Sequence, residues 1–268
     1  MRNLKQILLS ILVLTFIAAC DKDENDPKET LEKATISAKW NVDNSSEYES
    51  FEFNESGNYI VLKNTTTKST NDQIVLFGTY EIIDNKTIVL SDFGTLTILE
   101  VNENSISFNI QLISDPDNEI IINASKQTEM ENTTKTNLLC RTWKMVSVNG
   151  EDVVGTEYEL SVLFSKAGTY FVEYANTEYE DDGFLAYWKW SDDSETKFLY
   201  AIDYPPVWDE DDIVEVVELT SNSLKILERF DEDDEELYEL VPVINTKSMR
   251  IRTNKNLNKQ IKHGFLKK

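Results

Sequence analysis

The chain has very little of what catalytic and cofactor sites are usually made from. Its 268 residues hold one histidine, His263, close to the C-terminus. A Ser-His-Asp or Cys-His arrangement inside a folded domain is therefore excluded, as is a histidine-based zinc or iron site. The eight glycines are scattered singly, so the chain has neither a phosphate-binding loop nor a dinucleotide fingerprint. We accordingly expect no catalytic residue of these classes, no cofactor and no metal site.

Cysteine is almost as scarce, with only Cys20 and Cys140. Cys20 ends an apolar leader, so Cys140 is left without a partner and a disulfide framework is excluded. Cys140 follows two leucines and is interpreted as a small core residue. A reactive thiol would need a cationic neighbour and a base, and only Arg141 lies beside it in the sequence.

Basic residues are few, with 26 Lys and Arg against 49 Asp and Glu. Residues 1–19 hold two of the basic residues, and residues 247–268 hold eight, with no acidic residue in either segment. Residues 20–246 therefore carry 16 basic and 49 acidic side chains, a formal net charge of −33. Such a body repels nucleic acid and anionic lipid head groups, so we expect no nucleic-acid partner. The acidity is interpreted as a source of solubility.

The longest apolar run lies at the N-terminus and predicts an export signal. Arg2 and Lys5 precede the apolar run Ile7–Phe16. This run is too short to span a membrane, because a helix needs roughly 20 apolar residues to cross the hydrocarbon core. The run closes with Ile17-Ala18-Ala19-Cys20, which resembles the lipobox of bacterial lipoproteins. The resemblance implies that Cys20 is acylated and becomes the mature N-terminus, so that the protein is lipid-anchored to a membrane.

The residues after Cys20 extend this resemblance. Asp21-Lys22-Asp23-Glu24 places a lysine among acidic residues directly after the anchor. This pattern is similar to the export signal of Bacteroidetes lipoproteins, which implies the outer face of the outer membrane. The alternative interpretation of residues 20–33 is a plain acidic tether that contains a proline.

The rest of the chain repeats itself loosely. Trp40 leads to Phe51–Tyr59, which contains Gly57, and Trp143 leads to Leu163–Tyr170, which contains Gly168. Both segments run from apolar alternation into a glycine-containing turn and then into an aromatic residue, as hairpins do. Two copies of about 100 residues indicate duplicated domains, because a solenoid needs three or more short repeats.

Each copy is predicted to be β throughout, since period-two runs are separated by short turns and no long helical stripe occurs in the body. The runs of the first copy are 51–53, 59–62, 78–83, 87–90, 96–101, 105–113 and 119–123. Those of the second are 144–148, 160–164, 170–174, 185–190, 197–204, 213–219, 223–230 and 237–243. The predicted organisation is a signal peptide (1–19), tether (20–33), first β domain (34–125), polar linker (126–137), second β domain (138–246) and basic disordered tail (247–268).

The residues shared by the two copies also resemble a family. The first copy has Trp40, Phe53, Gly57, Tyr59, Gly78, Tyr80 and Ile106, and the second has Trp143, Phe164, Gly168, Tyr170, Ala186, Trp188, Leu219, Asn222, Ser223 and Leu224. This pattern is similar to the lipocalin-like domains of Bacteroidetes lipoproteins. The resemblance implies two tandem antiparallel up-and-down barrels or half-barrels. It implies no particular ligand.

An aromatic cluster in the second copy is the candidate binding site. Period two places Trp188 and Trp190 on one face of a strand, and Tyr204 ends the face of the next predicted strand. Trp208 follows in a loop and is expected to be the most exposed of the four. Large rings of this kind line apolar or sugar-stacking pockets, although they also fill barrel cores.

The sequence thus predicts a lipid-anchored, non-enzymatic envelope protein that binds a small apolar or glycan ligand or has a structural role. Two alternatives remain open. One is a polysaccharide-active enzyme that uses a pair of carboxylates. The other is an accessory subunit of an envelope complex, whose protein partner the sequence does not identify. The acidic runs 178–182, 209–212 and 231–236 are interpreted as solvated loop tips rather than calcium sites.

Overall fold

The computed structural model describes residues 31–44, 47–64, 73–175, 183–231, 234–243 and 265–266, which all belong to one compact unit. The signal peptide, Cys20 and most of the tether and basic tail therefore lie outside the described residues. No helix in the described part is long and apolar enough to span a bilayer.

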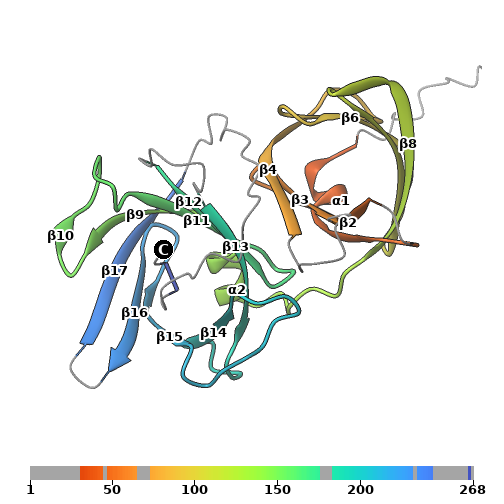
Figure 1. The fold of residues 1–268 in the computed structure, drawn as a ribbon. Coiled ribbons are helices and arrows are strands. Elements are labelled where there is room, and N and C mark those ends of the chain that lie inside the picture. Colours follow the sequence, from red (N-terminus) through yellow and green to blue (C-terminus); the bar gives the residue numbers. More distant parts are fainter. Residues whose placement is uncertain are drawn as a thin grey trace, which may run out of the picture. The chain divides into compact units, whose positions relative to one another are not determined.

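The first half of the chain folds into a closed barrel of eight antiparallel strands (Figure 1). Each strand pairs with the next along the sequence, and β1 pairs with β8 to close the ring. The strands are β1 (Ala38–Val42), β2 (Tyr48–Phe53), β3 (Asn58–Asn64), β4 (Gln73–Ile82), β5 (Thr87–Leu90), β6 (Gly94–Val101), β7 (Ser105–Leu112) and β8 (Asp115–Lys126). The helix α1 (Lys33–Ile36) precedes them.

The second half repeats this meander and also closes, through pairing of β9 with β17. Its short strand β10 pairs only with β9 and is a side hairpin of the ring. The strands are β9 (Thr142–Val148), β10 (Glu151–Asp152), β11 (Leu160–Phe164), β12 (Thr169–Tyr174), β13 (Gly183–Trp190), β14 (Lys197–Ala201), β15 (Ile213–Leu219), β16 (Leu224–Asp231) and β17 (Asp234–Pro242). The helix α2 (Thr134–Leu139) precedes them. The fold is therefore all-β with two tandem closed barrels, as the sequence predicts.

The two barrels begin with the same local structure. The buried indole of Trp40 donates a hydrogen bond to the carbonyl of Ile36 at the end of α1, at 2.9 Å. The buried indole of Trp143 donates to the carbonyl of Leu139 at the end of α2, also at 2.9 Å. A short helix that ends four residues before the tryptophan is thus tied to the first strand in both copies, which confirms the repeat predicted around these residues.

The two glycine-containing turns also correspond. Gly57 and Gly168 have φ of +91° and +81°, a conformation that residues with a Cβ rarely adopt. Each glycine carbonyl accepts a hydrogen bond across the sheet, from the backbone N–H of Tyr80 at 2.8 Å and of Trp188 at 2.9 Å. The turn between β2 and β3 and the turn between β11 and β12 are therefore held in the same way.

The alternation predicted for the second copy is confirmed at its core. Phe184, Ala186 and Trp188 of β13 and Phe198 and Tyr200 of β14 belong to one buried cluster. The strand predicted as 197–204, however, ends at Ala201, because the chain leaves the ladder before Pro205. The strand β1 was not among the predicted runs, although Ala38, Trp40 and Val42 alternate with Lys39 and Asn41 as expected for a strand.

Candidate functional site

The candidate residues divide between two sides of the second barrel's wall. Trp188 is buried in the core, and its ring centre lies 5.3 Å from that of the half-buried Trp190. The Trp190 indole donates to the hydroxyl of Thr136 in α2 at 2.9 Å. These two predicted site residues are therefore neighbours, and both pack on the barrel's core cluster.

Tyr204 and Trp208 lie elsewhere. The ring of Tyr204 packs on Tyr187, which precedes Trp188 in β13 and therefore faces the opposite side of the strand. Tyr204 is 45% exposed and Trp208 is only partly exposed, so the prediction that Trp208 is the most exposed of the four is wrong. The ammonium of Lys189 lies 4.5 Å from the ring centre of the partly exposed Trp208. Lys189 faces the same side of β13 as Tyr187. The four residues consequently do not form one aromatic floor.

The interior of the second barrel holds two residues from far outside its strands and the helix that precedes them. Phe265 and Leu266 are 0% and 2% exposed and belong to the barrel's core cluster. In Figure 1 the short dark-blue segment of these two residues is drawn within the outline of strands β9 to β17. The ring of Phe265 lies 4.8 Å from that of Tyr170 and 5.0 Å from that of Phe198, centre to centre. The core of this barrel is thus completed by a segment from the basic tail.

A buried carboxyl group faces this pair. Glu228 of β16 is 2% exposed, and its Oε1 accepts the backbone N–H of Phe265 at 2.6 Å and the hydroxyl of Tyr200 at 3.1 Å. Its Oε2 lies 3.3 Å from the hydroxyl of Tyr238, which also donates to Glu236 at 2.6 Å. Burial raises the pKa of Glu228 above its ordinary value, although the three hydrogen bonds oppose this shift.

Two tyrosines complete the polar contacts of the pair. The hydroxyl of Tyr170 donates to the carbonyl of Phe265 at 3.3 Å, and that of Tyr174 donates to the carbonyl of Leu266 at 3.1 Å. Burial raises the pKa of both phenols well above the ordinary value, so both remain protonated donors. The N–H of Phe265 and the carbonyls of Phe265 and Leu266 are therefore each bound by a side chain of the barrel wall.

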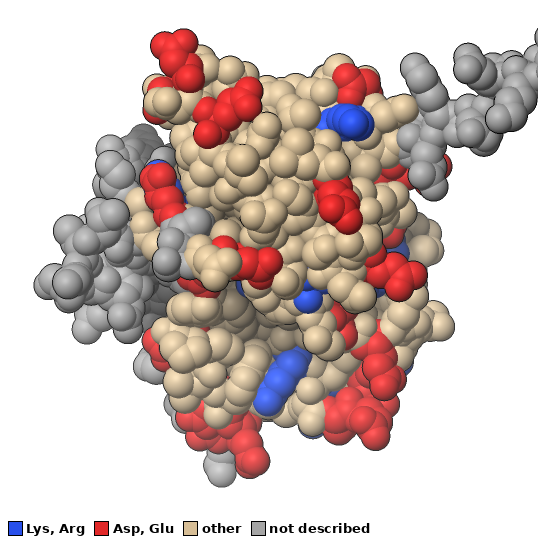
Figure 2. Space-filling view, turned by 90° about the vertical axis from the view of Figure 1, so that its right-hand side faces the viewer, with Lys and Arg blue, Asp and Glu red and all other residues tan. Residues whose placement is uncertain are grey.

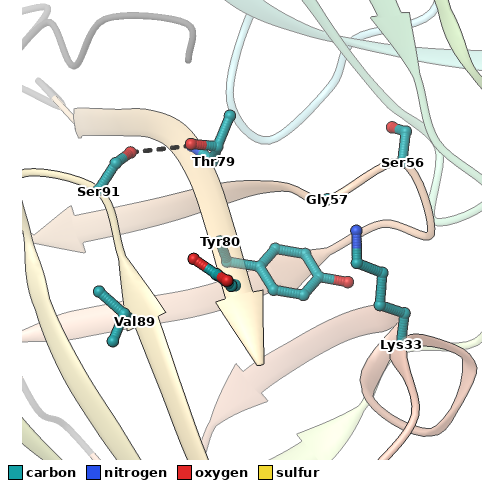
Figure 3. A pocket seen from close by; sticks show the side chains of 8 residues that line it. Lys33, Ser56, Gly57, Thr79, Tyr80, Val89 and Ser91 are labelled. Atoms are coloured by element: carbon teal, nitrogen blue, oxygen red, sulfur yellow. Dashed lines mark hydrogen bonds between the residues drawn. The ribbon is translucent and has the colours of Figure 1, made fainter. Parts of the chain in front are cut away.

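The first barrel offers a different kind of site. A surface pocket of about 350 Å³ is lined by residues of α1, of the turn between β2 and β3, of β4 and of the end of β5 (Figure 3). The Lys33 ammonium lies 5.4 Å from the ring centre of Tyr80 at its edge, and Ser91 accepts the backbone N–H of Thr79 at 3.0 Å. Glu81 also lines the pocket, and its negative charge offsets the positive charge of Lys33. The pocket therefore does not favour an anion.

Metal-binding chemistry finds no support in the described part of the chain. No group of three or more His, Cys, Asp or Glu side chains there is arranged to hold an ion. Cys140 is a free, partly buried cysteine whose pKa is raised by burial, so its thiol is protonated and unreactive at neutral pH. His263 and the acidic run 178–182 lie outside the described residues.

No family model matches this chain. No curated protein is significantly similar to it either.

The interior residues Glu228, Tyr170, Tyr174 and the pair Phe265–Leu266 were not among the predicted site residues. Glu228 belongs to an alternating strand in a chain with 49 acidic residues, so nothing local marks it as buried. One signal was present in the tail. Phe265–Leu266 is the only place between residues 247 and 268 where two large apolar residues are adjacent. Such a pair in an otherwise basic segment indicates a docking point rather than a solvated tail.

Proposed function

We propose that this protein is a non-enzymatic binding module and that the interior of its second barrel receives a small apolar ligand. One observation carries the proposal. The ring of strands β9 and β11–β17 accommodates Phe265 and Leu266 almost free of solvent, although neither residue belongs to the wall. An interior that admits a phenylalanine and a leucine side chain admits a ligand of similar size and polarity.

The first barrel is the weaker candidate because its own wall fills it. Its buried core cluster consists only of residues between Ile36 and Ala124, including Trp40, Phe51 and Phe108. No residue from outside its strands and the preceding helix contributes to that buried set among the described residues. We therefore assign the binding function to the second barrel and a supporting role to the first.

The interior chemistry favours binding over catalysis. Glu228 is held by hydroxyls of Tyr200 and Tyr238 and by a backbone N–H, so it acts as a fixed acceptor. A polysaccharide hydrolase needs two carboxyl groups on either side of an open sugar site. Here the neighbouring Glu236 shares the Tyr238 hydroxyl with Glu228 instead of facing it across a space.

The proposed cellular setting is the outer membrane, where the protein is anchored by a lipid on Cys20 and exposed at the cell surface. The N-terminal residues that resemble a lipobox and an export signal support this setting. The charge of the folded part is compatible with it. On the face drawn in Figure 2, Asp and Glu side chains predominate over Lys and Arg, as expected for a domain that stays clear of anionic head groups.

The experiment that tests this function uses N-phenyl-1-naphthylamine, a neutral apolar dye whose fluorescence rises on burial. We expect the full chain with Phe265→Ala and Leu266→Ala to bind the dye saturably, one molecule per chain, and to bind it at least tenfold more tightly than the parent. Val207→Ala, which removes a 67% exposed apolar side chain, is the matched control and should behave as the parent. A folded double variant with no saturable dye binding would favour a purely structural role.

A further inference from the structure

The pair Phe265–Leu266 is held by its backbone as well as by its side chains. The Phe265 N–H bonds to Glu228, the Phe265 carbonyl to Tyr170 and the Leu266 carbonyl to Tyr174. All three contacts come from strands of the barrel wall and reach consecutive amide groups. A wall that binds one polar group in each of three successive amides recognises a peptide backbone.

The Phe265 side chain has its own aromatic receptacle. Its ring lies 5.7 Å from Phe164 and 5.7 Å from Tyr200, in addition to the contacts with Tyr170 and Phe198. Four rings around one ring give a preference for an aromatic residue, since each aromatic pair adds attraction beyond that of burial. Burial of the phenylalanine ring itself also stabilises the bound peptide.

A ligand without amide groups would satisfy this interior poorly. Removing the peptide would take the backbone N–H from Glu228 and the acceptor from Tyr170, both of which are buried. A buried polar group that loses its partner weakens binding, because nothing then compensates its removal from water. The wall therefore discriminates against pure hydrocarbons and favours ligands that carry amides.

We propose, building on the function proposed above, that the second barrel is a receptor for a peptide with an aromatic residue followed by an aliphatic one. The chain's own Phe265–Leu266 is its resident occupant, and a partner peptide enters only by displacing it. The partner is basic around this pair, because residues 20–246 carry a net charge of −33 and the resident segment is followed by Lys267 and Lys268.

The covalent connection of Phe265–Leu266 to the barrel explains why such a site would be regulated. An occupant on the same chain has an effective concentration on the order of millimolar, so a free peptide of micromolar affinity competes poorly. The tail is thus an intramolecular competitor that sets the threshold for partner binding.

The test measures fluorescence anisotropy of a labelled peptide with the sequence of residues 264–268, Gly-Phe-Leu-Lys-Lys, titrated with the full chain. We expect the Phe265→Ala/Leu266→Ala variant to bind it with a stoichiometry of one and at least tenfold more tightly than the parent. The same peptide with alanine in place of phenylalanine should not bind. Adding Tyr170→Phe to the double variant should weaken peptide binding about 2- to 10-fold, as expected for one lost hydrogen bond.

The outcomes separate this inference from the proposed function. If the folded double variant binds N-phenyl-1-naphthylamine but not the peptide, peptide recognition is overturned and apolar binding stands. If it binds neither, both fail. If the double variant does not melt cooperatively, Leu266→Ala alone should still bind the peptide more tightly than the parent, and unchanged affinity would overturn the inference. A parent that is dimeric while the Leu266→Ala variant is monomeric would place the tail in a second copy and overturn the intramolecular assignment.

Discussion

At the residue scale, Glu228 is one of two glutamates buried among the described residues, the other being Glu52. The Glu228 carboxyl group is buried in a barrel core, and none of the ion pairs found among the described residues includes it. Its charge is stabilised only by hydrogen bonds, which is why burial still raises its pKa. Burial of an unpaired carboxyl group is unfavourable, so its presence in the wall of a candidate site indicates that it binds a hydrogen-bond donor of the ligand.

Glu228 is expected to make stability depend on pH in a defined direction. Because the folded state raises its pKa above the ordinary 4.5, the folded chain binds more protons than the unfolded chain between these two values. Between these two pKa values the free energy of unfolding falls as pH rises. Glu228→Gln does not show this fall, because glutamine has no carboxyl group to titrate. The urea midpoint of Glu228→Gln should therefore increase relative to the parent between pH 5 and pH 8, both above the pI of about 4.4.

The control for this experiment is Glu103→Gln, which changes an exposed glutamate in the turn between β6 and β7. Its midpoint relative to the parent should be the same at both pH values. A Glu228→Gln difference that stays constant or shrinks on going to pH 8 contradicts the assigned pKa direction.

The two equivalent tryptophans allow a second test at this scale. Trp143→Phe removes the indole N–H that binds the Leu139 carbonyl and should lower the free energy of unfolding by about 1–3 kcal/mol. Trp40→Phe should have a similar effect through Ile36. Trp208→Phe, which changes a partly exposed ring, should cost less than 1 kcal/mol. Equal costs at all three positions in urea unfolding would argue against the anchoring role.

At the scale of elements, most strands could be predicted because core-facing apolar residues recur at every second position, although in strands such as β3 the other face is buried too. The alternation of Leu96 and Ile98 or of Phe184, Ala186 and Trp188 is visible without any tertiary information. The strand β1 shows the same alternation, with Ala38, Trp40 and Val42 on one face, and was missed although this criterion could have found it. Strand ends such as Ala201 depend on where the ladder loses its partner, which local sequence does not encode.

The glycine-containing turns are the elements most sensitive to substitution. In Gly57→Ala the new Cβ would meet only the end of the Lys33 side chain, at 2.6 Å, and that chain can move. In Gly168→Ala it would lie 3.1 Å from the Trp188 carbonyl, which belongs to the sheet. Both variants bear the strain of positive φ, about 1–2 kcal/mol, and Gly168→Ala should cost more. Urea unfolding that ranks Gly57→Ala as the more damaging change would contradict this account of the turns.

At the scale of the whole molecule, the two barrels of the duplicated fold differ in which residues fill their interiors. One is filled by its own wall, and the other is completed by Phe265 and Leu266. The repeat and the fold class could be predicted because they are written in matching residues such as Trp40 and Trp143. The occupied interior could not, because it joins residues about 95 positions apart, such as Tyr170 and Phe265, that share no local pattern.

The proposed anchor is also a property of the whole molecule. We expect the parent chain, produced in a bacterium with lipoprotein-processing enzymes, to incorporate radioactive palmitate and to fractionate with membranes. Cys20→Ala should abolish both, because the thiol is the acylated group. Cys140→Ala is the matched control and should retain both. Labelling that persists in Cys20→Ala would overturn the anchor.

The central claim is that the second barrel's interior is a ligand site. The most direct measurement is a set of nuclear Overhauser contacts between bound N-phenyl-1-naphthylamine and the side chains of the Phe265→Ala/Leu266→Ala variant. We predict contacts to the four rings that surround Phe265 in the parent, namely Phe164, Tyr170, Phe198 and Tyr200. Contacts confined to the outer residues Tyr204 and Trp208, or to the pocket beside Tyr80, would contradict the claim.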